Sequence, residues 1–145
     1  MTYAKIILIA YPYIEDACRL IDSQIEKRSR LSFYSYKPCE KLAEKIADLI
    51  ADKRYLLLLK SKVSALIQRL TEEEKRLIGY KYFNNRPIEG FDYKSRQYFR
   101  KQVKVLDKFQ KLLEKAKLTE ENFIKYYADI PFIKSISIRL MKLAA

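Results

Sequence analysis

Basic side chains recur at helical spacing between positions 96 and 111 of the chain. Together with one amide, the set consists of Arg96, Gln97, Arg100, Lys101, Lys104, Lys108 and Lys111. At 100° per residue these side chains share one side of a helix, where six cations accompany a single anion, Asp107. Guanidinium and amide groups can each grip a purine edge with two hydrogen bonds. The pattern therefore predicts a helix that binds nucleic acid.

The two ends of this basic set suit different parts of a duplex. In helix-turn-helix proteins the N-terminal turns of the recognition helix meet the base edges. Here those turns carry the members of the set between Arg96 and Lys101. The members from Lys104 onward are better suited to phosphates, which position a protein without reading sequence.

The other side of the same helix is apolar. Its residues are Tyr98, Phe99, Gln102, Leu106, Phe109 and Leu113, extended by Val105 and Leu112. This side predicts contact with a core, with Tyr98 and Phe99 as anchors rather than as surfaces for base stacking. The helix is expected over Tyr93–Lys117, capped by either Asp92 or Ser95.

Other roles also fit a Lys-rich helix. Lysine is soluble and helix-forming, so a solvated or protein-contacting surface is one alternative. A basic amphipathic helix can also lie on an anionic membrane. Because acids hardly interrupt the run, nucleic acid is the favoured interpretation.

The composition narrows the class of function. The 145-residue chain has 30 Lys and Arg against 18 Asp and Glu, a net charge of +12, as expected for a protein that binds a polyanion. It has no His and only 2 Gly, so the commonest general base is missing and a glycine-rich phosphate cradle cannot form. We therefore expect neither an enzyme nor a cofactor or metal.

The cysteines and the N-terminal segment indicate the compartment. Cys18 and Cys39 do not form a C-x-x-C pair, and we expect buried thiols in a reducing cytoplasm rather than a disulfide. The apolar run Ile6–Ala10 is too short to span a membrane and is cut off by Pro12. Neither a membrane contact nor a signal peptide is expected.

Apolar residues at heptad spacing predict two long helices in the N-terminal half. The first stripe is Ile7, Tyr11, Ile14, Cys18, Ile21 and Ile25. This helix should kink or restart at Pro12 and end near Arg30. The second is expected over Pro38–Leu70, and its run Tyr55–Leu59 is apolar all round, which predicts a well-buried helix.

Local signals place the remaining helices. Thr71–Glu74 reads as a capping box that starts a helix, and Asn84–Pro87 ends it. A short helix is expected from Thr119, and Pro131 should break the pattern before a final amphipathic segment at Ile133–Leu143.

These elements predict an all-α fold, since so few Gly and Pro do not supply the turns of a β protein. We expect a single domain over residues 1–145, built as a helical bundle. Residues 1–70 form a helical hairpin that serves as scaffold, residues 71–117 the DNA-binding, helix-turn-helix-like part, and residues 118–145 the C-terminal helices.

The order of acidic capped helix, turn and S-R-Q-Y-F-R-K-Q-V-K-V-L-D-K-F resembles region-4-like helix-turn-helix domains of sigma factors, and most of all phage transcription regulators of the ArpU type. The matching positions are Ser95, Tyr98, Phe99, Arg100, Lys101, Leu106 and Phe109. The resemblance implies DNA binding near a promoter. The connection Asn84–Lys94 contains Pro87 and Gly90, so a first helix of the motif would have one turn at most.

The expected function is therefore DNA binding, sequence-specific or tolerant of structure, in bacterial or phage transcriptional regulation. The long N-terminal helices are expected to act as scaffold or as a homodimer interface. Two alternatives stay open: an adaptor that binds an acidic surface of another protein, and an RNA-binding accessory protein.

Overall fold

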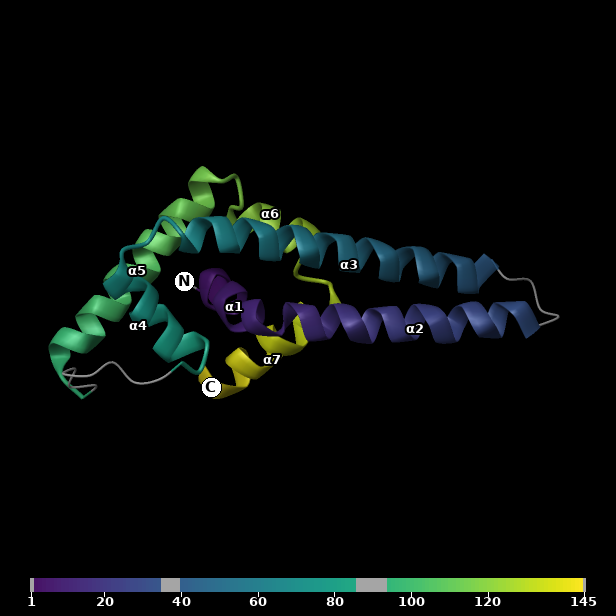
Figure 1. Ribbon diagram of the computed structural model, residues 1–145, viewed down its shortest axis with the longest axis horizontal. Helices are drawn as coiled ribbons and strands as arrows, with labels where there is room; N and C mark the ends of the chain where they lie inside the picture. Colours follow the sequence, from purple (N-terminus) through teal and green to yellow (C-terminus); the bar gives the residue numbers. More distant parts are fainter. Residues whose placement is uncertain (1, 35–39, 86–93, 145) are drawn as a thin grey trace.

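The computed structural model describes residues 2–34, 40–85 and 94–144, and these residues contain helices and no strand (Figure 1). The helices are α1 (Thr2–Ala10), the 3-10 turn η1 (Tyr11–Tyr13), α2 (Ile14–Tyr34), α3 (Glu40–Ile67), α4 (Glu72–Tyr82), α5 (Arg96–Lys115), α6 (Glu120–Tyr126) and α7 (Pro131–Ala144). The predicted all-α class is confirmed.

Several helix boundaries differ from those expected. α2 continues to Tyr34 instead of ending near Arg30, because no Gly or Pro interrupts it. Pro12 lies in η1, where the chain restarts as expected. Pro131 separates α6 from the final helix as expected, and it is itself the first residue of α7, since the first helical position does not need the N–H that proline lacks.

α2 and α3 form a hairpin whose outer part extends beyond the other helices (Figure 1). The stripe predicted for the first helix is turned inward, with Ile14 and Cys18 buried and Ile21 half-buried. Two lysines of α3 reach carboxylates of α2: Lys53 Nζ lies 2.8 Å from Asp22 Oδ1, and Lys60 pairs with Glu15. These ion pairs compensate the lysine charges at the contact between α2 and α3.

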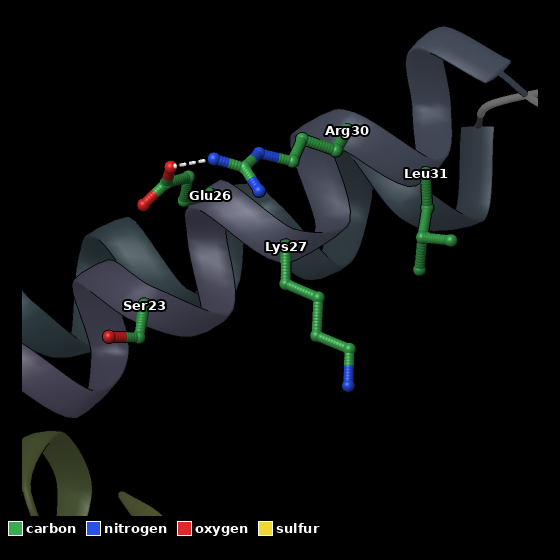
Figure 2. A pocket seen from close by; sticks show the side chains of 5 residues that line it. All are labelled: Ser23, Glu26, Lys27, Arg30 and Leu31. Atoms are coloured by element: carbon green, nitrogen blue, oxygen red, sulfur yellow. Dashed lines mark hydrogen bonds and ion pairs between the residues drawn. The ribbon is translucent and has the colours of Figure 1, made fainter.

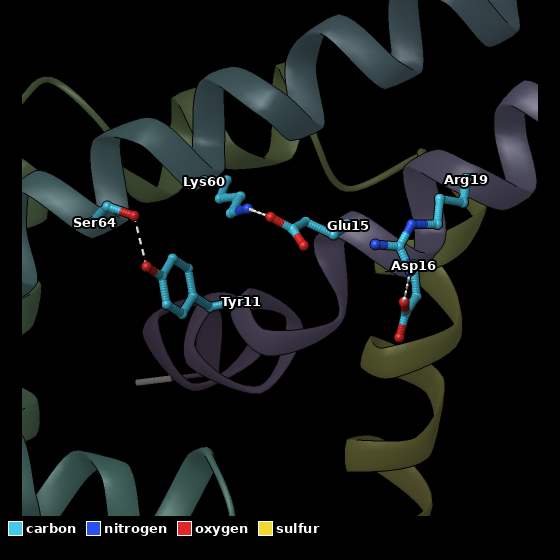
Figure 3. Close-up of polar contacts among 6 residues, drawn as sticks. All are labelled: Tyr11, Glu15, Asp16, Arg19, Lys60 and Ser64. Atoms are coloured by element: carbon cyan, nitrogen blue, oxygen red, sulfur yellow. Dashed lines mark hydrogen bonds and ion pairs between the residues drawn. The ribbon is translucent and has the colours of Figure 1, made fainter.

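Polar contacts also fix the base of the hairpin (Figure 3). The hydroxyl groups of Tyr11 in η1 and Ser64 in α3 share a hydrogen bond of 2.6 Å. It lies near the ion pair of Lys60 with Glu15, so η1 and the start of α2 are both tied to α3.

The prediction that Tyr55–Leu59 is buried all round is wrong. Leu56 and Leu59 are fully buried, but Tyr55, Leu57 and Leu58 are 37%, 44% and 47% exposed. The reason is that the core covers only one side of α3. Tyr55 is partly covered by the rings of Tyr126 and Tyr127, each with its centroid 5.8 Å away, whereas Leu57 and Leu58 stay open to solvent.

The hydrophobic core surrounds α1. This helix packs against α5 and α7, and its Ile7 and Leu8 are fully buried together with Phe109 and Ile133. The hydroxyl of Tyr3 donates a hydrogen bond to the Leu118 carbonyl oxygen at 3.4 Å. The N-terminal apolar run is therefore a core helix.

Two further expectations concern the cysteines and the membrane. Cys18 is a buried free thiol, and Cys39 lies outside the described residues. Among the described helices, none combines the length and apolar character needed to cross a membrane.

Candidate nucleic-acid interface

α5 begins at a capped N-terminus and turns one side into the core. Ser95 is the cap, and its hydroxyl accepts the backbone N–H of Tyr98 at 3.1 Å, which settles the choice left open between Asp92 and Ser95. The buried residues of the helix are Tyr98, Gln102, Val105, Phe109, Gln110 and Leu113. The predicted apolar side is thus mostly confirmed.

A buried amide joins α5 to α4. Gln102 Nε2 donates to the Leu77 carbonyl oxygen at 2.9 Å and to the Tyr98 hydroxyl at 3.0 Å. Because a buried amide without partners is costly, these two bonds fix the rotation of α5 about its axis. That rotation decides which side chains of α5 face water.

Three cations of the predicted set lie on the outward strip of α5. Arg96, Arg100 and Lys104 are exposed, and none forms an ion pair with the described residues. They follow one another at intervals of four residues, about 6 Å along the helix axis. Gln97 is exposed beside Arg96 and Arg100. We call these four residues the outward strip.

The other three cations of the set are matched by carboxylates. Lys101 Nζ lies 2.6 Å from Glu73 Oε1, and Lys108 Nζ lies 2.6 Å from Glu74 Oε1, both across the contact with α4. Lys111 pairs with Asp107 of its own helix at 3.2 Å. The expected face of hardly relieved positive charge is therefore divided, because the acidic first turn of α4 lies against one flank of α5.

Glu74 belongs to both a helix cap and an interhelical ion pair. Its Oε1 accepts the backbone N–H of Thr71 at 2.9 Å, while its own N–H donates to the Thr71 hydroxyl at 3.2 Å, so the predicted capping box is present. Burial raises the pKa of this carboxyl, but the hydrogen bonds from Lys108 and Thr71 outweigh burial and hold the pKa below its usual value.

The expectation that Phe99 is a core anchor is wrong. Its side chain is 56% exposed, and Val103 one turn later is 68% exposed, whereas Tyr98 is buried as predicted. The core meets α5 on the side of Phe109, so Phe99 falls at the edge of the apolar side. The Phe99 ring packs edge-on against Tyr98, with ring centroids 5.5 Å apart.

A hollow of about 520 Å³ lies beside Phe99. Its lining residues are Tyr80, Lys81, Asn84, Asn85, Tyr98 and Phe99. The sequence pattern marked Asn84 and Asn85 only as the end of a helix and did not identify Lys81. The usable signal was the alternation of aromatic, cationic and amide residues from Tyr80 to Asn85.

The connection between α4 and α5 bears on the helix-turn-helix prediction. Residues 86–93, which include Pro87 and Gly90, lie outside the described residues. The contact between α4 and α5 is described, and the first helix expected for the motif is not.

Other hollows occur on the described surface. A shallow one of about 360 Å³ on α2 is lined by Ser23, Glu26, Lys27, Arg30 and Leu31, where Arg30 pairs with Glu26 at 2.6 Å (Figure 2). A larger groove of about 670 Å³ lies between α2 and α7, with Leu20, Ile21 and Phe132 among its lining residues. Among the described residues, no group of three His, Cys, Asp or Glu could hold a metal ion.

Comparison of the chain with protein-family models, with curated proteins and with solved structures gave no significant match.

Proposed function

We propose that the chain binds nucleic acid, with DNA favoured, through the outward strip of α5. The observation that carries this proposal is the row of Arg96, Arg100 and Lys104, which are exposed and unmatched by carboxylates among the described residues. Three fixed cations along one helix can neutralise successive phosphates and release their counterions. The net charge of +12 favours approach to a polyanion.

The shape of α5 suits a groove as well as a backbone. A helix with its side chains is about 10–12 Å across, and the major groove of B-DNA is about 12 Å wide. Gln97, Arg96 and Arg100 lie in the first turns of α5, the part of a recognition helix that reaches base edges. These groups support binding to DNA without catalysis.

The biological role follows from the resemblance to sigma region 4 and ArpU-type regulators. On that basis we assign the chain to transcriptional regulation in the cytoplasm of a bacterium, or to a phage. The ion-paired Lys101, Lys108 and Lys111 then have a secondary part, since a phosphate must compete with Glu73, Glu74 or Asp107 to reach them.

The salt dependence of binding tests this proposal. Each phosphate contact with duplex DNA steepens the plot of log K against log salt by about 0.9. The triple variant Arg96→Ala, Arg100→Ala, Lys104→Ala should therefore flatten the slope by about 2.7. Fluorescence anisotropy of labelled duplex DNA over a series of salt concentrations measures both slopes.

A control variant with the same net charge distinguishes the effect of the outward strip from the effect of the overall charge of the protein. Lys134, Arg139 and Lys142 are exposed on α7, and replacing these three by Ala removes the same number of cations. This variant should keep a slope close to that of the unaltered chain. Equal slopes for the two triple variants would contradict the proposal, and a flat slope for the unaltered chain would favour an adaptor for an acidic protein surface.

A second candidate function, self-association, is favoured by the outer side of α3. An exposed stripe of low charge follows it at intervals of three or four residues, made of Ala43, Ala47, Ile50, Arg54, Leu57, Ser61 and Ala65. A second copy of the chain would offer the same stripe as a matching surface. A two-fold axis beside Leu57 and Leu58 would set Ile50 of one copy against Ala65 of the other, large against small.

A further inference from the structure

Phe99 is an exposed aromatic ring in a fixed position. More than half of its side chain faces solvent, at 56% exposure. Its neighbour Tyr98 packs edge-on against Phe99 on one side and against Tyr80 of α4 on the other, with the Tyr80 and Tyr98 centroids 6.3 Å apart. An aromatic surface held in this way can stack a planar ligand at little cost in side-chain entropy.

Two amide residues, Asn84 and Asn85, line the hollow beside the ring. Asn84 has a positive φ of 54°, and its Nδ2 donates to the Tyr13 hydroxyl at 3.4 Å. The backbone N–H of Asn85 donates to the Gly79 carbonyl oxygen at 3.0 Å, and the Asn85 side chain lies so close to Gly79 that a Cβ there would collide with it. Amides offer both donors and acceptors, which is the chemistry of a nucleobase edge.

One cation lines the same hollow, and another lies near its Phe99 side. Arg96 lies three residues before Phe99, so its side chain is a near neighbour of the ring on the surface of α5. Arg100 follows Phe99 directly and points about 100° further round the helix. Lys81 lines the hollow, and it pairs with no carboxylate among the described residues. Burial and the charge of Lys5 lower the pKa of Lys81, so an anion close to this ammonium group would be stabilised.

We infer that the hollow holds one nucleotide of a strand whose base is unpaired. The base stacks on Phe99 with its edge facing Asn84 and Asn85, and Arg96 and Lys81 hold the adjoining phosphates. This inference rests on the proposed function and adds a substrate class to it, namely nucleic acid with an unpaired base. The hollow of about 520 Å³ is large enough for a base and its sugar. Stacking on an aromatic ring accepts any base, so the site selects unpaired bases rather than a sequence.

The absence of tryptophan from the chain allows a direct test, because any introduced tryptophan is the only one. The variant Phe99→Trp places an indole at the proposed stacking position. The variant Val103→Trp is the matched control, on the same exposed helix one turn later. The probes are a single-stranded oligothymidylate, an abasic strand of the same length, and a fully paired duplex.

Stacking of a base on the indole should quench its fluorescence. We expect oligothymidylate to quench the Phe99→Trp variant strongly and the Val103→Trp variant little. The abasic strand and the duplex should bind with little quenching of either variant. Equal quenching of the two variants, or quenching of Phe99→Trp by the abasic strand equal to that by oligothymidylate, would overturn the inference.

A second experiment measures the binding affinity of variants that lack tryptophan. Phe99→Ala should weaken binding of oligothymidylate by about 5- to 100-fold, the range expected for loss of one aromatic–base stack. It should leave duplex binding nearly unchanged, and Val103→Ala should change neither. If Phe99→Ala leaves oligothymidylate affinity unaltered, the stacking site is wrong while the phosphate contacts of the proposed function stand. If neither probe binds the unaltered chain, both proposals fail.

Discussion

Phe99 and Phe109 lie on the same helix in opposite surroundings. Phe109 is fully buried, and Phe99 is 56% exposed. The helical wheel places both rings on one apolar side, but it cannot find the edge of that side, because the edge depends on which helices pack there. For the same reason the sequence pattern did not predict that Lys101 and Lys108 form ion pairs, since their carboxylate partners belong to α4.

The two phenylalanines predict different losses of stability. Phe109→Ala should lower the free energy of unfolding by about 3–5 kcal/mol, because it removes a buried ring and leaves a cavity. Phe99→Ala should cost less than about 1 kcal/mol, as is usual at exposed positions. Urea unfolding followed by circular dichroism measures both, and similar losses for the two variants would show that the rotation of α5 is different from that described.

At the scale of the helix, caps were the most predictable features. The Thr71–Glu74 capping box depends on residues three apart, so the sequence alone specifies it, and the structure contains it. The ion pair of Glu74 with Lys108 joins residues 34 apart in the chain, and it requires the packing of α4 on α5. A local pattern cannot contain that information.

The double role of Glu74 predicts a pH dependence of stability. Its pKa is lower in the folded state than the ordinary value of 4.5, so the ionised group stabilises the fold above that pH. This contribution is lost as the pH falls below 4.5 through the folded pKa. Glu74→Gln keeps a residue that can cap but removes the charge, and should cost about 1 kcal/mol near neutral pH.

Unfolding at several pH values checks this prediction. The difference between Glu74→Gln and the unaltered chain should be largest above the ordinary carboxyl pKa of 4.5 and should shrink as the pH falls through the lower pKa of the folded state. Glu72→Gln is the control, because Glu72 is exposed and its ion-pair partner among the described residues is Lys75 of the same helix, at 3.3 Å. A Glu74→Gln difference that does not change with pH would contradict the assignment.

Over the whole molecule, the helical class followed from the scarcity of Gly and Pro, and the arrangement of the helices did not follow from any local pattern. The run Ile6–Ala10 was judged only too short to span a membrane, and the helices α5 and α7 that bury it are distant in sequence. The apolar run Tyr55–Leu59 also gave no sign that one side of α3 would remain uncovered. Tertiary packing decided both outcomes.

The uncovered side of α3 predicts a dimer of the chain. Sedimentation velocity at micromolar concentration should show a dimer for the unaltered protein. Leu57→Glu should give a monomer, because it places a charge in the middle of the proposed interface. Leu31→Glu is the control, since Leu31 is 51% exposed on α2 and lies outside the stripe. A monomer at all concentrations would contradict self-association through α3.

The central position of α1 has a consequence for biosynthesis. α1 leaves the ribosome before α5 and α7, the helices that enclose it. Translation proceeds at roughly 5–20 residues per second, so the isoleucine and leucine side chains of α1 stay unburied for several seconds or more before those helices are made. The nascent chain thus exposes an apolar segment that chaperones can recognise. The hydrophobic core can form only after α7 has been synthesised.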